Sequence, residues 1–538
     1  MTLAALLATA AGAVAQTAGA VAQATGAGAQ TAGQRQLSPA LVTSVLNVAL
    51  GEFDVIHGGL GHRGKQVPAT MLVLAARRLA ETGDARLREV LTRTLDAMAR
   101  GAIRDQLDGG FFRATTDRAW RLPDFERLDV VQAQAIVAYL LGYQATGEAR
   151  YRAVAEETLA YVGRALVRKD GGFNAGQRAP AGSFLWNEAD VRAASPADAD
   201  LVVRHFGLAG VTERRALTVD YDAPSLAAET KVPLESIERR LREARERLRQ
   251  ARAGRGEPGL DDTVYADRGA RLASAYFEAY KVLGGEERLR VALDALEFLH
   301  TRLGQKDGGM AHAIRDGRVD ADGSLDDQFA PAAAFLDAFE ITGAAHHLAS
   351  ARALVAHAIA RYGAPDGGFF DTPADAVAPQ KRFVDGDGLG GNALAAVVLE
   401  RLHALTNEPS YRARARETLA ALPPAQPLGS ALAGYAYAVD LSVNGAPHVV
   451  VAGKTADART AVLLRGGLRA FRPGKIVERY DPELSDLAAV PPPVAAVLRQ
   501  QIAVTEPRAY VCTGNVCSLP QSDGERLREM VERLGRRP

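Results

Sequence analysis

Two short patterns recur along this chain at nearly the same interval, and they constrain its fold more than any other feature. The first resembles "ATGEARYRAV" at 145–154 and occurs five times, with turn residues Gly83, Gly147, Gly285, Gly343 and Asn407. Their separations are 64, 138, 58 and 64 residues, and the longest is close to two periods of about 69. A recurrence of this length is typical of repeat architectures.

Each copy has the features of one helix ending and another beginning. Gly and Asn favour the left-handed conformation that follows a helix C-terminus. An acidic residue usually comes next, and negative charge is stabilised at a helix N-terminus. Apolar residues recur at helical spacing before and after the turns, for example at Leu128, Val131, Ala135, Ala138 and Leu141. Each copy is therefore predicted to be the tip of a helical hairpin.

The second pattern lies between the hairpins and has the same rhythm. It reads "DGGFF" from Asp108, "DGGF" from Asp170, "DGGM" from Asp307 and "DGGFF" from Asp366. The Gly pair permits a sharp loop with positive φ, and the apolar residue that follows can plug one end of a barrel. An architectural role is favoured for these loops.

The repeats predict a mainly α protein, an (α/α)6 six-hairpin toroid. Five hairpins are expected at about 66–105, 127–168, 263–303, 326–362 and 389–422, and segments 38–50 and 429–440 would pack together as the sixth. The toroid is placed at 37–440, with an insertion at about 175–260 that ends in a charged surface helix. Residues 441–538 contain short apolar strands and two helices, which predicts a small C-terminal α/β appendage.

Composition limits the classes of function. Among 538 residues, Lys and Arg number 64, as do Asp and Glu, so the net charge is zero, which argues against nucleic-acid binding. No apolar run after the N-terminus is long enough to span a membrane. Segment 1–36 combines a signal-like apolar start, ending near Ala15, with an Ala/Gly/Gln repeat, but no basic residue precedes Arg35. A periplasmic or secreted protein is expected, with a cytoplasmic one as the alternative. Oligomeric state is left open.

The two cysteines, Cys512 and Cys517, lie in "VCTGNVCSLP". Two thiols this close can form a short-loop disulfide or stay reduced, and a structural disulfide is expected if the protein is exported. A closed zinc site normally has four ligands, and the ligand-type residue nearest in sequence, His448, is far away along the chain. We predict no metal site and no cofactor.

The loop at 108–129 is the richest in groups that could act on a sugar. Aromatic faces stack on sugar rings, and carboxylates donate and accept protons. Asp117, Glu126 and Asp327 are the candidate catalytic residues. The candidate substrate-binding residues are Arg113, Trp120, Asp124, Asp262, Asp385 and Asn392. Two structural alternatives stay open: acidic residues before helices often act only as caps, and Trp120 can be a core residue.

A co-linear set of motifs resembles the spermatogenesis-associated, thioredoxin-domain-containing protein family. The set covers about 53 to 538 and comprises "GGLGHRGKQVP", "DQLDGGFFRATTDRAWRLPDFERL", "GSFLWNEADV", "GLDDTVYADRGA", "SLDDQFA", "GGFFDTPAD", "DGLGGNALAA" and "AYVCTGNVCSLP". The resemblance implies a six-hairpin, glycosidase-like toroid. The family's N-terminal thioredoxin-like module has no counterpart in this sequence, because only about fifty residues precede the match.

Departures from the family pattern leave two hypotheses. Asp124 replaces a His, Val130-Val131 replaces Tyr-Asp, and Ala266-Asp267-Arg268 replaces Ser-Trp-Asn. The residues that still match the family pattern are Arg113, Asp117, Glu126, Asp262, Asp327 and Asn392. The first hypothesis is a carbohydrate-active enzyme that hydrolyses or epimerises its substrate by carboxylate acid–base chemistry. The second is a non-catalytic toroid that binds a sugar or a protein. Under either hypothesis Arg113, Asp117, Trp120 and Glu126 are expected to converge with Asp327 and Asp385 at one mouth of the ring.

Overall fold

The computed structural model describes residues 35–534, apart from 257, 322, 485–486, 488–491, 501–505 and 515. The predicted signal-like and repetitive segment therefore lies, as far as residue 34, outside the described residues. Arg35 begins the described chain, and its guanidinium donates to backbone carbonyls of Pro423, Pro424 and Gln426. The two ends of the toroid sequence thus meet.

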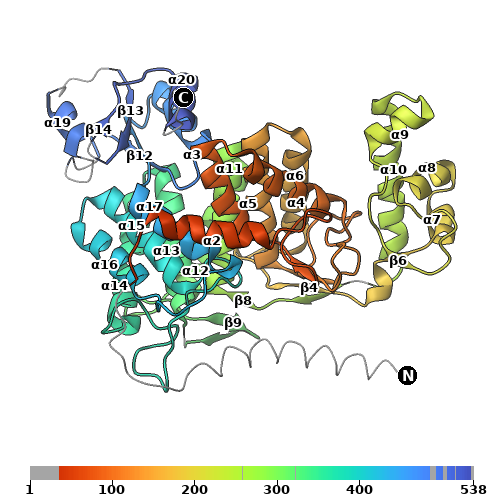
Figure 1. Cartoon of the computed structure of the whole chain (residues 1–538), viewed down its shortest axis with the longest axis horizontal. Coiled ribbons are helices and arrows are strands. Elements are labelled where there is room, and N and C mark those ends of the chain that lie inside the picture. The colour runs from red at the N-terminus through yellow and green to blue at the C-terminus, as the bar shows by residue number, and fades with distance from the viewer. Residues whose placement is uncertain are drawn as a thin grey trace.

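Six helices form a closed inner ring, which confirms the predicted toroid. Each contacts the next one along the chain, and the last contacts the first. These helices are α3 (Ala69–Thr82), α5 (Asp129–Thr146), α11 (Ala266–Leu283), α13 (Leu325–Thr342), α15 (Gly391–Thr406) and α17 (Ala433–Asn444). Figure 1 shows the red N-terminal helices beside the blue-cyan α17, as ring closure requires.

Six further helices cover the outside of the ring. They are α2 (Pro39–Gly51), α4 (Ala85–Arg100), α6 (Ala149–Ala165), α12 (Glu286–Leu303), α14 (Ala345–Tyr362) and α16 (Pro409–Ala420). Five pair with the inner helix that immediately precedes them in sequence, and α2 packs on α17. The sixth hairpin is therefore made from the two ends of the toroid sequence, as the repeat spacing predicted.

The hairpin tips have the expected helix-ending geometry with one difference. Gly83, Gly147, Gly343 and Asn407 each follow an inner helix with φ between 55° and 75°. In the remaining copy the residue that ends α11 is Gly284, with φ of 74°, and Gly285 is already the cap of α12. The Gly-Gly pair thus shifts the turn by one residue.

The Gly-Gly loops lie at the other end of the inner helices and are held by side-chain amides. Gln132 accepts from the N–H of Phe111 at 2.7 Å and donates to its carbonyl at 2.8 Å. Gln328 pairs in the same way with Met310, and Asn392 with Phe369. All three amides are buried. Each clamps the apolar residue after a Gly-Gly pair to the start of an inner helix.

The insertion between α6 and α11 forms a lobe beside the ring. Figure 1 shows it on the right, connected to the ring by short strands. Its elements are β4 (Gly176–Arg178), β5 (Leu185–Trp186), α7 (Glu188–Ala194), α8 (Ala199–His205), β6 (Arg215–Ala216), α9 (Ala223–Thr230), α10 (Leu234–Ala253) and β7 (Gly259–Asp261). Trp186, Val191, Leu208 and Leu248 are among the residues of its own small core.

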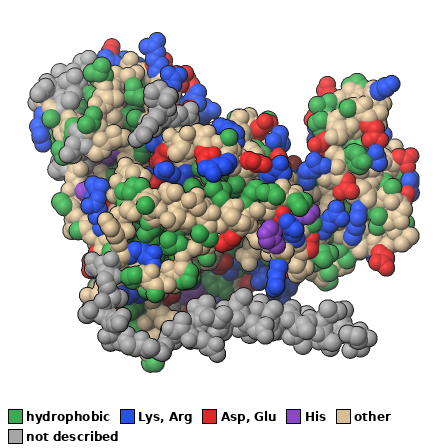
Figure 2. Space-filling view, viewed as in Figure 1, with side chains coloured by type: hydrophobic (Ala, Val, Ile, Leu, Met, Phe, Trp, Pro, Cys, Tyr) green, Lys and Arg blue, Asp and Glu red, His purple; other side chains and the backbone are tan. Residues whose placement is uncertain are grey.

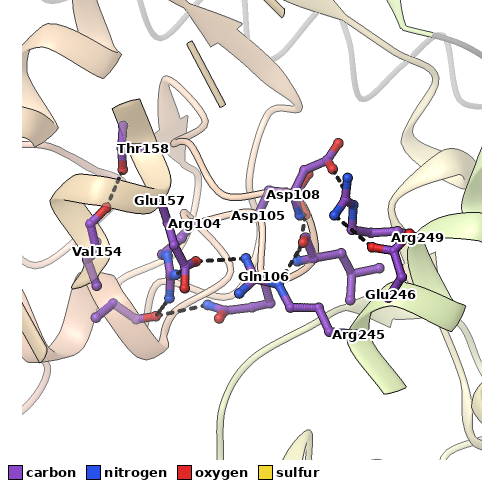
Figure 3. A network of polar contacts seen from close by, with 12 residues as sticks. Arg104, Asp105, Gln106, Asp108, Val154, Glu157, Thr158, Arg245, Glu246 and Arg249 are labelled. Atoms are coloured by element: carbon purple, nitrogen blue, oxygen red, sulfur yellow. Dashed lines mark hydrogen bonds and ion pairs between the residues drawn. The ribbon is translucent and has the colours of Figure 1, made fainter. Parts of the chain in front are cut away.

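Arginines on α10 anchor this lobe to the first Gly-Gly loop. Figure 3 shows Arg245 reaching Glu157 of α6, at 2.7 Å, and Arg249 reaching Asp108, at 3.0 Å. Nearby, Arg252 and Arg127 both lie 2.9 Å from the buried Asp105. Burial alone would raise the pKa of Asp105, but the two guanidinium groups hold it at about 2. The charged face of α10 is therefore an intramolecular docking face.

The C-terminal appendage is a four-stranded sheet with helices on both faces. Strands β11 (His448–Ala452), β12 (Ile476–Tyr480), β13 (Arg508–Thr513) and β14 (Val516–Cys517) have the order β12-β11-β13-β14. Helices α18 (Ala458–Arg469) and α20 (Gly524–Arg533) pack together. Apolar residues of α19 (Pro492–Gln500) join a cluster with Val450 and Tyr510.

The appendage closes the tip end of the ring. A cavity of only about 70 Å³ lies between the inner helices and the appendage loop that contains Arg472 and Lys475. Around it, Lys281 of α11 pairs with Asp337 of α13 at 3.2 Å, and Arg401 of α15 pairs with Glu340 at 2.7 Å. The loop end is consequently the end of the ring where a ligand can be sought.

The described helices and one face of the surface bear on membrane spanning and on charge distribution. Of the helices in residues 35–534, none that the structure describes is both long and apolar enough to cross a bilayer. On the face in Figure 2, acidic and basic side chains are interspersed over the ring and over the projecting insertion lobe.

Replacement of Gln132 by Leu tests the amide clamps. The Phe111 N–H and carbonyl would lose both partners in a buried place, at a cost of about 1–3 kcal/mol for each group. We therefore expect Gln132→Leu to lower the free energy of unfolding by about 2–5 kcal/mol in urea denaturation. Gln250→Leu, on an exposed face of α10, is the control and should change it little. Equal losses in both variants would contradict a clamping role.

Candidate functional site

Asp117 shapes its own loop. Its carboxylate accepts from the backbone N–H groups of Ala119, Arg121 and Leu122 at 2.9, 2.9 and 2.6 Å. Three such bonds occupy both oxygens and fix a turn. Asp117 therefore organises its own turn, and its convergence with the other carboxylates stays a prediction.

Trp120 is a core residue in this structure, which is the structural alternative left open above. Its side chain is 1% exposed, and its Nε1 donates to the carbonyl of His57 at 2.8 Å. A Cβ on Gly59 would come within 2.5 Å of its ring, so the Gly-Gly pair at 58–59 makes room for the indole. Trp120 also has φ of 62°, which the surrounding contacts impose on a bulky residue. It offers no stacking face to a ligand.

Arg113, Asp124 and Glu126 do form one cluster, together with Arg178. Arg113 Nε lies 2.8 Å from Asp124 Oδ2 and 2.9 Å from Glu126 Oε2. Arg178 also pairs with Glu126. Glu126 and Arg178 are paired residues in a sheet of β3 (Glu126–Leu128), β4 and β7, and both line a groove of about 720 Å³ there. The Glu126 carboxylate is thus engaged by two guanidinium groups.

The remaining predicted binding residues lie in two other surroundings. Asp262 is exposed, and its carbonyl accepts from Arg168 at 3.2 Å. Asn392 is one of the buried amide clamps and also donates to the carbonyl of Arg382 at 3.1 Å. Among the described residues, no hydrogen bond or ion pair links Glu126 to Asp327 or Asp385. The contacts thus place Asp262 at the surface and Asn392 in an amide clamp, and the convergence of Glu126 with Asp327 and Asp385 stays a prediction.

Asp327 lies at the start of α13, where it has two roles. It forms a capping box with Ser324, whose hydroxyl lies 2.8 Å from Asp327 Oδ2. The same oxygen lies 2.9 Å from His312 Nδ1, and Asp327 Oδ1 accepts from the N–H of Asp267 at 3.3 Å. The buried carboxylate thus joins the starts of α11 and α13 to His312, which follows the third Gly-Gly loop.

His312 is the partly exposed member of this group. Its side chain is 36% exposed, and its ring packs edge-on against Tyr265, with centroids 5.3 Å apart. Arg268 lies over the same tyrosine ring at 4.7 Å and is itself held by Asp129, with Nε 2.7 Å from Oδ1. The hydrogen bond to Asp327 raises the pKa of His312. We name Tyr265, Asp267, Arg268, His312 and Asp327 the axial cluster.

Asp267 supplies a second proton-transfer group to the axial cluster. Burial, and then the neighbouring Asp327 carboxylate, raise the pKa of Asp267 to about 6. A carboxylic acid with such a pKa is partly protonated near neutral pH and can act as an acid. His312, whose pKa is raised by its hydrogen bond to Asp327, is the other group of the axial cluster that can exchange a proton.

Asp385 belongs to loop 381–390, which reaches across the start of the inner ring. Its Oδ2 accepts from the N–H of Gly434 in α17 at 2.8 Å, and its own N–H donates to Ala431 at 2.7 Å. Thr70 of α3 also bonds this carboxyl, and burial raises the pKa of Asp385 to about 6. The loop thereby ties α15 to α17 and α3, and Asp385 positions it.

Sequence reasoning missed Tyr265, Asp267, Arg268 and His312 as site residues. A signal existed, because Asp267 is the second residue of an inner helix and His312 follows "DGGM" by two residues. The number of charged and aromatic residues favoured loop 108–129 instead, and that number does not indicate where the side chains point. In the described part of the chain, no group of three or more His, Cys, Asp or Glu side chains is arranged to hold a metal ion.

Comparison with known proteins confirms the resemblance that the motifs indicated. The chain is 26% identical over 559 residues to human spermatogenesis-associated protein 20, across 93% of this chain and 70% of that protein. The protein from Mus musculus is 25% identical over 558 residues, with the same coverage of both chains. The chain is thus homologous to spermatogenesis-associated protein 20. No family model matches it.

Two solved structures illustrate the similarity in fold. A family 76 glycoside hydrolase, an alpha-mannanase from Bacteroides thetaiotaomicron, aligns with 75% of this chain and 95% of its own at a TM-score of 0.48 and 11% identity. A D-mannose isomerase aligns with 75% and 97%, at a TM-score of 0.46 and 10% identity. At such scores the similarity says nothing of activity, and the toroid is established by its own helix contacts.

The raised pKa of Asp385 predicts a dependence of stability on pH. Its pKa is 3.8 in the unfolded reference and about 6 in the fold, so between these values the unfolded chain releases a proton that the folded chain keeps. This group therefore lowers the free energy of unfolding as pH rises from about 4 to about 6, and adds no further change above that. The Asn side chain of Asp385→Asn cannot ionise. The free energy of unfolding of this variant, relative to that of the wild type, should therefore rise across this window by up to about 3 kcal/mol.

Urea denaturation at a series of pH values measures this difference. Asp387→Asn, at an exposed position of the same loop, is the matched control. If Asp385→Asn and the wild type differed by the same amount at pH 4 and pH 7, the burial of an uncharged Asp385 would be refuted.

Proposed function

We propose that this toroid, homologous to spermatogenesis-associated protein 20, acts on a carbohydrate by general acid–base catalysis at the axial cluster. The observation that carries the proposal is the partly exposed His312, which is bonded through Nδ1 to the buried Asp327 and packed edge-on against Tyr265. Asp267, at the start of the neighbouring helix α11, donates its backbone N–H to Asp327, and its pKa is raised to about 6. An aromatic face, an acid and a base together suit a polyhydroxylated ring.

Each residue has a defined part in the proposed chemistry. A proton on Nδ1 of His312, donated to Asp327, leaves the lone pair on Nε2, which can take a proton from the substrate or from water. Asp267 in its acid form can give a proton to a glycosidic or carbonyl oxygen. Arg268 lies over Tyr265 and can bond hydroxyl oxygens of the ring.

Two reaction types use this pair of groups differently. In hydrolysis, His312 would activate a water molecule while Asp267 protonates the leaving oxygen. In epimerisation, His312 would remove the proton from the carbon beside a sugar carbonyl and a proton would return to the opposite face. The two outcomes can be separated by where deuterium from solvent is incorporated.

A second candidate is a toroid that binds a sugar or a protein without turnover. It is favoured by the number of carboxylates at this end that are neutralised by arginine. Glu126 pairs with Arg113 and Arg178, Asp129 with Arg268, and Asp326 with Arg382 at 2.9 Å.

Proton NMR in heavy water over a panel of free sugars and disaccharides tests the proposal. Hydrolysis should produce new reducing ends, and epimerisation should place deuterium on the carbon beside the carbonyl. His312→Gln should lower turnover by about 10²- to 10⁴-fold, the usual contribution of a general acid or base, with an unchanged Tm. Glu126→Gln, in the separate groove, is the control and should remain active.

Two results would decide against catalysis at the axial cluster. A folded wild type that binds a sugar of the panel without converting it would favour the binding toroid. Full activity of the His312→Gln protein would move the chemistry away from the axial cluster.

A further inference from the structure

One face of the appendage sheet carries a row of four reactive side chains, one from each strand. Cys512 of β13 is the register partner of Cys517 on β14 and of His448 on β11. Residues directly opposite each other in antiparallel strands point to the same face, with Cβ atoms about 5 Å apart. Glu478 of β12 continues the row, because its Oε2 lies 3.0 Å from His448 Nε2. The order across the sheet is therefore Glu478, His448, Cys512, Cys517.

The histidine and glutamate of this row are both buried. They are 5% and 4% exposed, where an unpaired carboxylate or imidazole would be costly. Burial raises the pKa of Glu478, and the hydrogen bond with His448 opposes that rise. The pair occupies a place in a small apolar core in which Val450, Tyr480 and Tyr510 are neighbours on the same sheet. Packing alone would favour apolar residues at both positions.

The two cysteines form a disulfide whose sulfurs differ in access. Cys512 is 2% exposed, whereas Cys517 is partly exposed on the edge strand β14. The bond links residues only five apart that β-pairing already places opposite each other. A crosslink of so short a loop removes little entropy from the unfolded chain. Stabilisation is thus a weak reason for this bond.

We propose that Cys512–Cys517 is a thiol–disulfide exchange centre, in which His448 exchanges the proton of Cys512 and Glu478 positions His448. The co-reactant is a dithiol, either a small molecule or a pair of cysteines on another protein. The proposal does not depend on the carbohydrate chemistry of the toroid, since the row lies in the appendage.

The exchange balances in two steps. A thiolate of the dithiol attacks Sγ of Cys517, the accessible sulfur, and the Cys512–Cys517 bond breaks as the new S–S bond forms. Cys512 leaves as a thiolate beside His448, which stabilises it or supplies its proton. The second thiol of the co-reactant, as a thiolate, then attacks the co-reactant sulfur that is bonded to Cys517. A disulfide forms within the co-reactant, and Cys517 leaves as a thiolate. Two electrons and two protons pass to the protein, and the co-reactant leaves as a disulfide.

Dithiothreitol is the probe for a test on the full-length, oxidised and folded chain. The reduction is run at pH 7 without denaturant, and samples are quenched at intervals. Free thiols are labelled with N-ethylmaleimide and counted from the protein mass by mass spectrometry. We expect two labels to appear while thermal unfolding of the reduced protein stays cooperative. Reoxidation by oxidised glutathione should restore the unlabelled mass. A bond that opened only after denaturant was added would overturn the proposal.

Four variants separate exchange chemistry from a structural role. His448→Ala should slow reduction at least about tenfold and shift the equilibrium with glutathione toward the disulfide, because the Cys512 thiolate loses its partner. Glu478→Gln should do the same to a smaller extent, and Glu478→Asp should keep most of the wild-type rate. His62→Ala, an exposed histidine on the ring, is the control.

One result with these variants would refute the proposal. Wild-type rates and glutathione equilibria in both His448→Ala and Glu478→Gln would show that the row takes no part in exchange. If His448→Ala does not fold, the comparison of Glu478→Gln with Glu478→Asp decides alone.

Discussion

The ring closes at a single buried arginine. Arg77 of α3 pairs with Asp440 of α17 and also donates to the carbonyls of Pro473 and Gly445, at 2.9 and 3.2 Å. One side chain therefore connects the first inner helix, the last inner helix and the appendage. A guanidinium removed from water is tolerated only when its donors are satisfied, so the three parts must dock together for any of these contacts to be stable. The rest of the toroid depends on this closure, because an open row of hairpins would expose the apolar faces of α3 and α17.

The two ends of the inner ring differ in how their charged groups are paired. At the tip end, Lys281, Asp337, Glu340 and Arg401 neutralise one another under the appendage. At the loop end the Gly-Gly loops and two small sheets bring carboxylates to helix starts, where the helix dipole favours negative charge. Some of these carboxylates are matched by arginine and serve structure. In the described part of the chain no ion pair joins Asp267 or Asp385 to an arginine, and burial raises the pKa of both, as it also raises that of Asp129 beside Arg268.

Much of the fold could be predicted from the sequence, and much less of the site. The left-handed residues at Gly83 and Asn407 and the cap at Ser324 depend on chain neighbours, so local rules found them. Loop 108–129 was correctly seen as rich in charge, and Arg113, Asp124 and Glu126 do meet. The number of charged residues could not predict the directions of the Asp117 and Trp120 side chains. N–H groups of the same turn fix Asp117, and the space above Gly59 admits Trp120.

By itself, the sequence determined the number of hairpins, their order and the existence of an inserted lobe and an appendage, because each depends on a periodicity of about 3.6 residues or on turn residues that act within a few positions. Only the tertiary structure decided which side chains share a site. His312 meets Asp327 and Tyr265, and His448 meets Cys512, across 15, 47 and 64 residues of chain. Such meetings follow from ring closure and strand register, which are set by the packing of whole elements and leave no local mark in the sequence.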